Sequence, residues 1–196
     1  MTMPPRALAF LIAASFTIII YVITRASGRG SLVDGADGRP ITSKTQWWIW
    51  TAAVIFGYVA VFVERWLRGD PSAGIAVPQN LLLAMGFSGA SMVAAKAVTT
   101  TYVARGLIDK PKTSSGLGGI LTDDDGVPDL GKIQNIAFTI IAVFVYMVRL
   151  ATQGDPPVLV DIDPSLMLLM GLSHAGYLGT KLATRDTPDA EPGGTK

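Results

Sequence analysis

Residues 37–51 read DGRPITSKTQWWIWT, and residues 125–139 read DGVPDLGKIQNIAFT. Six residues are identical between these stretches at a spacing of 88 positions. Farther along, LLLAMGFSGASMVAAK at 81–96 is followed 85 positions later by LMLLMGLSHAGYLGTK at 166–181. A sequence that resembles itself at a nearly fixed spacing indicates a repeated structural unit. The sequence therefore predicts two tandem copies of one unit.

The composition is that of a membrane protein. The 196 residues are 49% hydrophobic and 16% charged, whereas soluble domains have about 25% charged residues. Because the charges are missing from long blocks, the main expected partner is the lipid bilayer. The absence of cysteine excludes disulfides and thiolate metal sites. A formal net charge of +1 gives no reason to expect nucleic acid, and no cofactor motif is found, so none is expected.

Five segments are apolar enough to be considered as spans, since about 20 apolar residues cross a bilayer. They are roughly 7–24, 46–66, 79–98, 134–151 and 165–182. The third and fifth are rich in Gly, Ser and Ala, so each is either a core-facing span or a re-entrant helix. The expected fold is an all-α integral membrane protein with five transmembrane helices, one N-terminal helix plus two parallel tandem helical-hairpin repeats.

This interpretation divides the chain into five parts. They are the N-terminal helix with the start of a cytoplasmic loop (1–30), the first hairpin repeat (31–100), a flexible cytoplasmic linker (101–118), the second hairpin repeat (119–185) and a disordered cytoplasmic tail (186–196). Cytoplasmic loops collect Lys and Arg. With five spans, twelve basic residues lie on one side and four on the other, which predicts an outside N-terminus and a cytoplasmic C-terminus. Two spans per unit make the copies parallel.

The Asp-Gly stretches that precede both repeats invite a calcium interpretation, but neither has the ligand spacing of an EF-hand loop. We expect them to be turns that deliver the chain into a helix, with Thr42 or Ser43 and Asp129 as N-caps. An adventitious or regulatory cation site at residues 123–125 is the alternative.

Matched residues on the outgoing helices recur at spacings of 4 and 8, which places them on one helical face. They are Gln46, Trp50 and Tyr58 in the first copy and Gln134, Phe138 and Tyr146 in the second. Shared identity on one face predicts a shared packing environment, with each helix docked on its hairpin partner in the same way. A polar stripe lining a pathway is the alternative.

The returning helices carry small residues about one turn apart, which allow close backbone contact in lipid. The residues expected to serve helix packing or oligomer contact are Gly86, Ser88, Ala90, Gly171, Ser173, Ala175 and Gly179. Close contact of this kind occurs within a subunit or between subunits, and we expect a homo-oligomer whose contact includes a returning helix.

Two features of the returning helices have an enzymatic alternative. Gly86-Phe87-Ser88-Gly89 resembles the GxSG nucleophile motif of rhomboid intramembrane proteases, and His174 followed by Gly176 and Gly179 is similar to their histidine helix. The resemblance implies serine attack with histidine as base. However, Ser88 has a repeat counterpart in Ser173, and the six-span rhomboid core has no match. His174 is therefore expected to be a hydrogen-bonded helix-packing residue.

The expected function is that of a non-enzymatic polytopic membrane protein, a self-associating scaffold or anchor, or a pore subunit of a larger assembly. A soluble cytoplasmic protein is a further candidate partner, bound at the linker. No carboxylate lies well inside a span, which argues against an ion-coupled transporter, so a small passive channel or carrier is the alternative. The combined pattern is similar to that of small bacterial membrane proteins, which suggests the bacterial inner membrane.

Overall fold

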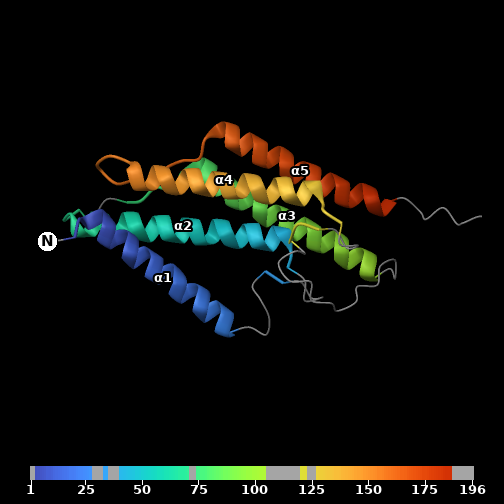
Figure 1. Cartoon of the computed structure of the whole chain (residues 1–196), viewed down its shortest axis with the longest axis horizontal. Coiled ribbons are helices and arrows are strands. Elements are labelled where there is room, and N and C mark those ends of the chain that lie inside the picture. Colours follow the sequence, from blue (N-terminus) through green and yellow to red (C-terminus); the bar gives the residue numbers. More distant parts are fainter. Residues whose placement is uncertain are drawn as a thin grey trace, which may run out of the picture.

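The computed structural model describes residues 3–27, 33–34, 40–70, 74–104, 120–122 and 127–186. Within these ranges the protein is all-helical, and its only strand-like pairings are two isolated bridges. The helices are α1 (Pro5–Ser27), α2 (Thr42–Leu67), α3 (Gln79–Ala104), α4 (Leu130–Thr152) and α5 (Pro164–Asp186), as Figure 1 shows. The all-α prediction is confirmed. The greater part of the predicted linker, from residue 105, and the tail from residue 187 lie outside the described residues.

Three of the described helices, α1, α2 and α4, are long and apolar enough to cross a membrane by length and composition. They indicate a membrane location. Helices α3 and α5 have comparable lengths. Their mixture of Gly, Ser, Thr and Lys with apolar residues lowers their hydropathy, and this is the same property that made these two segments ambiguous in the sequence.

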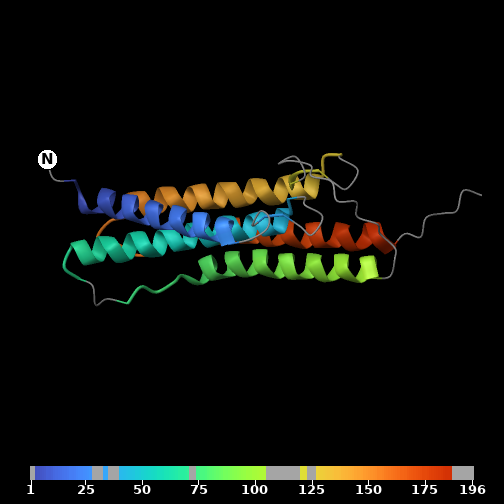
Figure 2. The ribbon, with the colours of Figure 1, turned by 90° about the horizontal axis from the view of Figure 1, so that it is seen from below.

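Four helices form two layers. Helices α2 and α4 run side by side in one direction, and α3 and α5 return in the other direction (Figures 1 and 2). Each layer contacts the other, because α3 packs on α2 and α5 packs on α4, while α3 and α5 also contact each other. Helix α1 packs against α2. The core between the layers is made of large apolar side chains such as Trp50, Leu81, Leu150 and Met170.

The same local contacts precede α2 and α4, 88 positions apart. Each segment folds back on itself through one backbone hydrogen bond, and a lysine in the first turn of the helix donates to a carbonyl of that segment. The contacts are Ile41 N to Val33 O (2.7 Å) and Lys44 Nζ to Asp34 O (2.7 Å), then Asp129 N to Leu121 O (2.8 Å) and Lys132 Nζ to Thr122 O (2.6 Å). Bridges pair Asp34 with Pro40 and Thr122 with Pro128. Residues 123–125, the alternative cation site, lie outside the described residues.

The two helix starts differ in their caps. Asp129 is the N-cap of α4 and accepts a hydrogen bond from Lys132 N at 3.1 Å, so this prediction is confirmed. The expectation of a Thr42 or Ser43 cap on α2 is wrong. Ile41 occupies that position without a side-chain bond. The Thr42 hydroxyl instead donates to Ile120 O at 2.8 Å, which ties the start of α2 to the segment before the second hairpin.

The matched residues on α2 and α4 do not share an environment, which corrects the prediction made for Gln46, Trp50, Tyr58, Gln134, Phe138 and Tyr146. Gln46 is fully buried and Gln134 is exposed, whereas Tyr58 is 43% exposed and Tyr146 only 1%. Trp50 is fully buried and Phe138 only partly.

The physical reason for this difference is a rotation of α4 relative to α2. The buried positions of α4 are Asn135, Thr139, Ala142, Tyr146 and Leu150, each one position beyond the counterpart of a buried α2 residue. One residue turns an α-helix by about 100°. Helix α2 has neighbours in α1, α3 and α4, whereas α4 lies against α2 and α5, so different sides of the two helices are covered.

Candidate functional site

A network of polar side chains lies between the two helix layers. From α2, Gln46 Nε2 donates to Asn135 O at 2.9 Å and to Thr139 Oγ1 at 2.8 Å. On α4, Thr139 Oγ1 donates to Asn135 O at 3.0 Å. All three side chains are fully buried. The amide of Gln46 therefore links α2 to α4 through Asn135 O, which also accepts a hydrogen bond from Thr139 of the same helix.

The returning helices enter the same network through His174. Its Nδ1 lies 2.9 Å from Ser91 Oγ of α3 and 3.5 Å from Asn135 Nδ2 of α4. Because an amide nitrogen only donates, this geometry makes Nδ1 the acceptor and places the proton of a neutral imidazole on Nε2. We refer to Gln46, Ser91, Asn135, Thr139 and His174 as the central polar network. It joins α2, α3, α4 and α5, and His174 is confirmed as a hydrogen-bonded packing residue.

The network has hydrogen-bonding capacity that the described residues do not use. Four buried polar atoms in or next to it make no hydrogen bond within the described part of the chain: Ser43 Oγ, Gln46 Oε1, Ser173 Oγ and His174 Nε2. Buried polar groups are normally paired, with protein or with ordered water. The central polar network therefore keeps donors and acceptors that the described residues do not pair.

The seven small residues predicted for packing divide between two surfaces. Gly86, Ala90, Ala175 and Gly179 are exposed on the outside of the bundle. Three others face inward. Ser88 donates to Ala84 O within α3 at 3.2 Å, Ser173 is buried, and a methyl group added at Gly171 would lie 3.6 Å from the Phe87 ring. The seven residues were grouped in the sequence because they align between the two copies. In the structure, four of them face outward and three face inward.

The serine and histidine singled out by the resemblance to rhomboids do not pair. The hydroxyl of Ser88 bonds within its own helix, whereas the partner of His174 is Ser91. Ser91 lies outside the GxSG stretch, so that motif could not have found it. Helical spacing could have pointed to Ser91, because it lies three residues after Ser88 and therefore on the same face of the helix. Ser91 is 1% exposed and His174 is 4% exposed.

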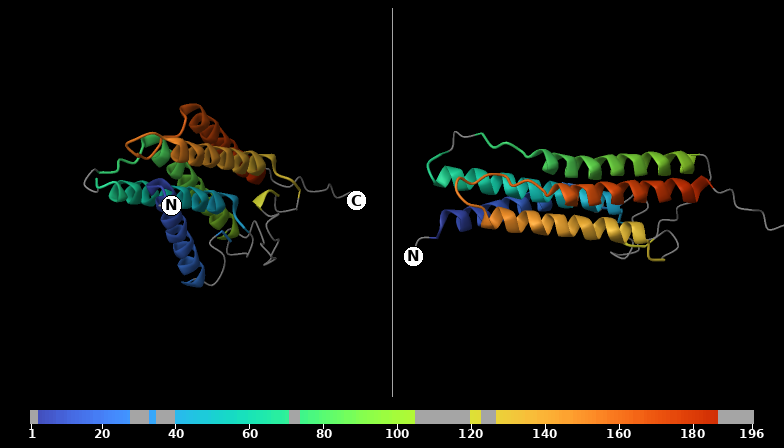
Figure 3. Two further views of the ribbon diagram at one scale, coloured as in Figure 1. Left: turned by 60° about the vertical axis from the view of Figure 1, so that its left-hand side comes forward. Right: turned by 90° about the horizontal axis from the view of Figure 1, so that it is seen from above.

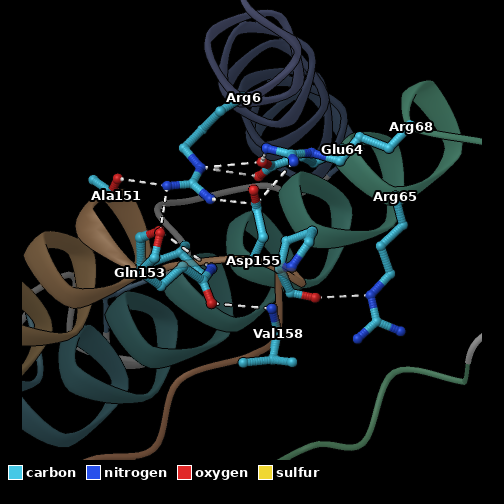
Figure 4. A network of polar contacts seen from close by, with 10 residues as sticks. Arg6, Glu64, Arg65, Arg68, Ala151, Gln153, Asp155 and Val158 are labelled. Atoms are coloured by element: carbon cyan, nitrogen blue, oxygen red, sulfur yellow. Dashed lines mark hydrogen bonds and ion pairs between the residues drawn. The ribbon is translucent and has the colours of Figure 1, made fainter. Parts of the chain in front are cut away.

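A second polar cluster lies at the end of the bundle where α2 ends and α1 begins (Figure 4). Glu64 near the end of α2 is 1% exposed and pairs with two arginines. Its Oε1 lies 3.1 Å from Arg6 Nε of α1 and 2.6 Å from Arg68 Nη2. Arg68 Nη1 also pairs with Asp155 at 2.8 Å. Arg6 Nη1 donates to Gln153 O at 2.6 Å. The cluster therefore joins α1, α2 and the segment after α4.

Charge in this cluster is balanced locally. The hydrogen bond to Glu64 raises the pKa of Arg68 above its ordinary value, so the guanidinium stays charged. An open hollow of about 330 Å³ beside it is lined by Arg65, Arg68, Asp70, Asp155, Pro156 and Pro157. Two basic and two acidic side chains give this hollow no preference for an ion of either sign.

Part of this cluster could have been found from the sequence, because Glu64 and Arg68 are four residues apart and so are neighbours along one helix. Arg6 and Asp155 were missed because they are 58 and 91 positions from Glu64. For Asp155 a signal existed, since Gly154-Asp155-Pro156 repeats Gly69-Asp70-Pro71. For Arg6 we find none.

Replacing Gln46 by Leu should lower the free energy of unfolding by about 1 kcal/mol, the usual net value of a buried hydrogen bond. The matched control is Gln134→Leu, because Gln134 is the sequence counterpart of Gln46 and is exposed. This control should change the stability by less than about 0.5 kcal/mol. Denaturation of both variants in mixed micelles, followed by circular dichroism, provides the comparison. Equal effects would contradict a specific role for Gln46.

Comparison of the chain with known protein families, with curated proteins and with solved structures finds no match.

Proposed function

We propose that this protein is a non-enzymatic membrane scaffold or anchor, or a pore subunit, that acts as a homo-oligomer. The observation that carries the proposal is the outward position of Gly86, Ala90, Ala175 and Gly179 on α3 and α5. In lipid, no hydrophobic drive brings helices together, and small residues favour association by allowing close backbone contact. Outward-facing small residues therefore suit contact with a neighbouring subunit.

The proposed topology has five spans, with the N-terminus outside and the C-terminus in the cytoplasm. Helices α3 and α5 return the chain after α2 and α4, and the distribution of basic residues supports the orientation. We further propose that the two hairpins are copies of one unit. The recurrence of the same turn contacts at Lys44 and Lys132 supports this. The segment between the hairpins would then be cytoplasmic and available to a soluble protein partner.

The central polar network fits a structural role better than a catalytic one. Ser91 and His174 have a hydrogen-bonding geometry that a serine nucleophile and its base would need. Both side chains are almost completely buried, and a substrate would have to part four helices to reach them. The network instead gives each of its five side chains at least one hydrogen-bond partner inside the bundle. Solute flux into vesicles that contain the purified protein would distinguish a small passive channel from a scaffold.

The oligomer is tested by native mass spectrometry of the intact chain in mild detergent, where we expect a discrete oligomer. Gly86→Leu should weaken it at least tenfold in dissociation constant, since a methyl group on Gly86 would meet no atom of its own subunit within 4 Å. A matched control is Ser15→Leu, which enlarges an exposed residue of α1 and should leave the oligomer unchanged. A monomeric wild-type chain across several mild detergents would contradict the proposal.

A further inference from the structure

The open hollow beside the Glu64 cluster lies at the level where two helices that can cross a membrane end. Its lining residues come from 65–70, at the end of α2, and from 155–157, just after α4. Both helices are long and apolar enough to cross a membrane, and they end at the same end of the bundle (Figures 1 and 3). Trp66 is 61% exposed, which suits a tryptophan at the membrane interface. The hollow is therefore at the level of the lipid headgroups.

The two arginines of the hollow are held in place by other parts of the chain. Arg65 Nε donates to Pro157 O at 2.8 Å (Figure 4), and Arg65 Nη1 donates to Gly74 O at 3.3 Å. Arg68 Nη1 pairs with Asp155 Oδ1 at 2.8 Å. Guanidinium groups that are already positioned lose less side-chain freedom when a ligand binds. They also present several N–H donors in a planar fork that matches a phosphate group.

The two aspartates of the hollow are accessible from outside the bundle. Asp70 is exposed, and its carboxylate makes no hydrogen bond or ion pair with the described residues. The Asp155 side chain is 67% exposed, and its ion pairs with Arg6 and Arg68 are made through Oδ1. A carboxylate accepts hydrogen bonds from an ammonium group. The hollow therefore offers donors for a phosphate and acceptors for an ammonium group within one set of residues.

This mixture of charges selects a ligand that carries both signs. A simple anion would be attracted by the arginines and repelled by the aspartates, and a simple cation would meet the reverse. The volume of about 330 Å³ lies at the lower end of the range of about 300–1,000 Å³ that is usual for small-molecule sites. Pro156 and Pro157 add an apolar wall. These properties fit a small zwitterion at the membrane surface.

We propose that the hollow binds the headgroup of a zwitterionic phospholipid, phosphatidylethanolamine, with its phosphate at Arg65 and Arg68 and its ammonium group at Asp70 and Asp155. A primary ammonium group is required because a quaternary one has no N–H to donate to the carboxylates. The proposal needs only the membrane location and the cluster at the end of α2. It does not depend on self-association or on which side of the membrane this end faces.

Native mass spectrometry of the intact chain in mild detergent tests the site with three phospholipids that have identical acyl chains. Phosphatidylcholine keeps the phosphate and the positive charge but has no N–H donor, and phosphatidylglycerol keeps the phosphate without a positive charge. Phosphatidylethanolamine should bind with a dissociation constant about fivefold lower than either, which is the upper end of what an exposed ion pair contributes. Equal binding of the three lipids, or tightest binding of phosphatidylglycerol, would overturn the proposal.

Two variants locate the preference in the hollow. Asp70→Asn and Asp155→Asn should each bring the affinity for phosphatidylethanolamine close to that for phosphatidylcholine. Asp70→Asn is the sharper of the two, because a carboxylate without a partner among the described residues can be changed without disturbing the fold. The matched control is Asp163→Asn, an exposed acid that does not line the hollow. Asp163 Oδ1 accepts from Ser165 N at 2.8 Å, which an asparagine can also do, so the preference should remain.

The remaining results separate the possible occupants. An unchanged preference in both Asp70→Asn and Asp155→Asn would overturn the site, because the selectivity would then arise elsewhere on the protein. Soluble glycerophosphoethanolamine should bind much more weakly than the lipid, since it lacks the acyl chains. Equal affinity for both would make a soluble compound the occupant and would overturn the lipid assignment. A monomeric chain that keeps the preference would remove the proposed oligomer and leave this site intact.

Discussion

A Gly57→Ala variant should lose about 2 kcal/mol of stability, although alanine is the better helix former by about 1 kcal/mol. The cause is a collision in the packing of α2 against α4. A methyl group on Gly57 would collide with Tyr146 Oη and would lie 3.2 Å from Leu159 Cδ2. Tyr146 is 1% exposed, so its ring cannot turn out toward the surface without a shift of its neighbours. The helices must separate locally, and overpacking of this kind costs about 1–3 kcal/mol.

The matched control for this variant is Gly86→Ala, because a methyl group there meets nothing within 4 Å. Gly86→Ala should be neutral or stabilising by up to about 1 kcal/mol. Adding Tyr146→Phe to Gly57→Ala removes the closest atom and should restore part of the loss. Thermal unfolding in detergent, followed by circular dichroism, measures all three. The same shift for Gly57→Ala and Gly86→Ala would contradict the close contact of Gly57 with Tyr146.

Local features of the fold could be predicted from the sequence because they depend on neighbouring residues. The blocks without charge predict helices that match α1, α2 and α4. Asp129 caps α4 because its side chain needs only the backbone three residues ahead. The ambiguous hydropathy of α3 and α5 was also visible, because it follows from composition alone.

The environment of each helix could not be predicted in the same way. Gln46 and Gln134 occupy matched positions, yet one is buried and the other exposed. Identity between two copies preserves local conformation, whereas burial depends on which neighbours the rest of the chain supplies. The non-helical segment 157–163 before α5 has a similar origin. A Gly-Asp-Pro stretch is typical of a turn, but its sequence does not show that Leu159 and Ile162 of the following chain are buried in the core.

Replacing Glu64 by Gln should lower the stability by about 3 kcal/mol, the largest effect that we expect from a single substitution in this chain. Removal of one partner from a buried ion pair costs about 3–5 kcal/mol because it leaves charge without compensation. The low end applies here, since Arg6 is 25% exposed and Arg68 34% exposed. The substitution keeps the shape of the side chain, so the effect reports on charge and not on packing.

The loss should concentrate on the docking of α1, because Glu64 is the residue of α2 that pairs with Arg6 at 3.1 Å. Asp70→Asn is the matched control, since it removes the same charge from an exposed residue just beyond α2. It should change the stability by less than about 0.5 kcal/mol. Unfolding in mixed micelles gives the global value, and limited proteolysis between α1 and α2 reports the release of α1. If the variants at Glu64 and Asp70 have equal stability and equal cleavage, then Glu64 does not hold α1 in place.

A second comparison separates the effect of charge from the effect of contact between α1 and α2. The double variant Glu64→Leu with Arg6→Leu removes both charges of that pair, and Arg68 keeps Asp155 as its partner. It should therefore be more stable than Glu64→Gln, because no guanidinium is left without a partner when the pair is replaced by an apolar contact between α1 and α2.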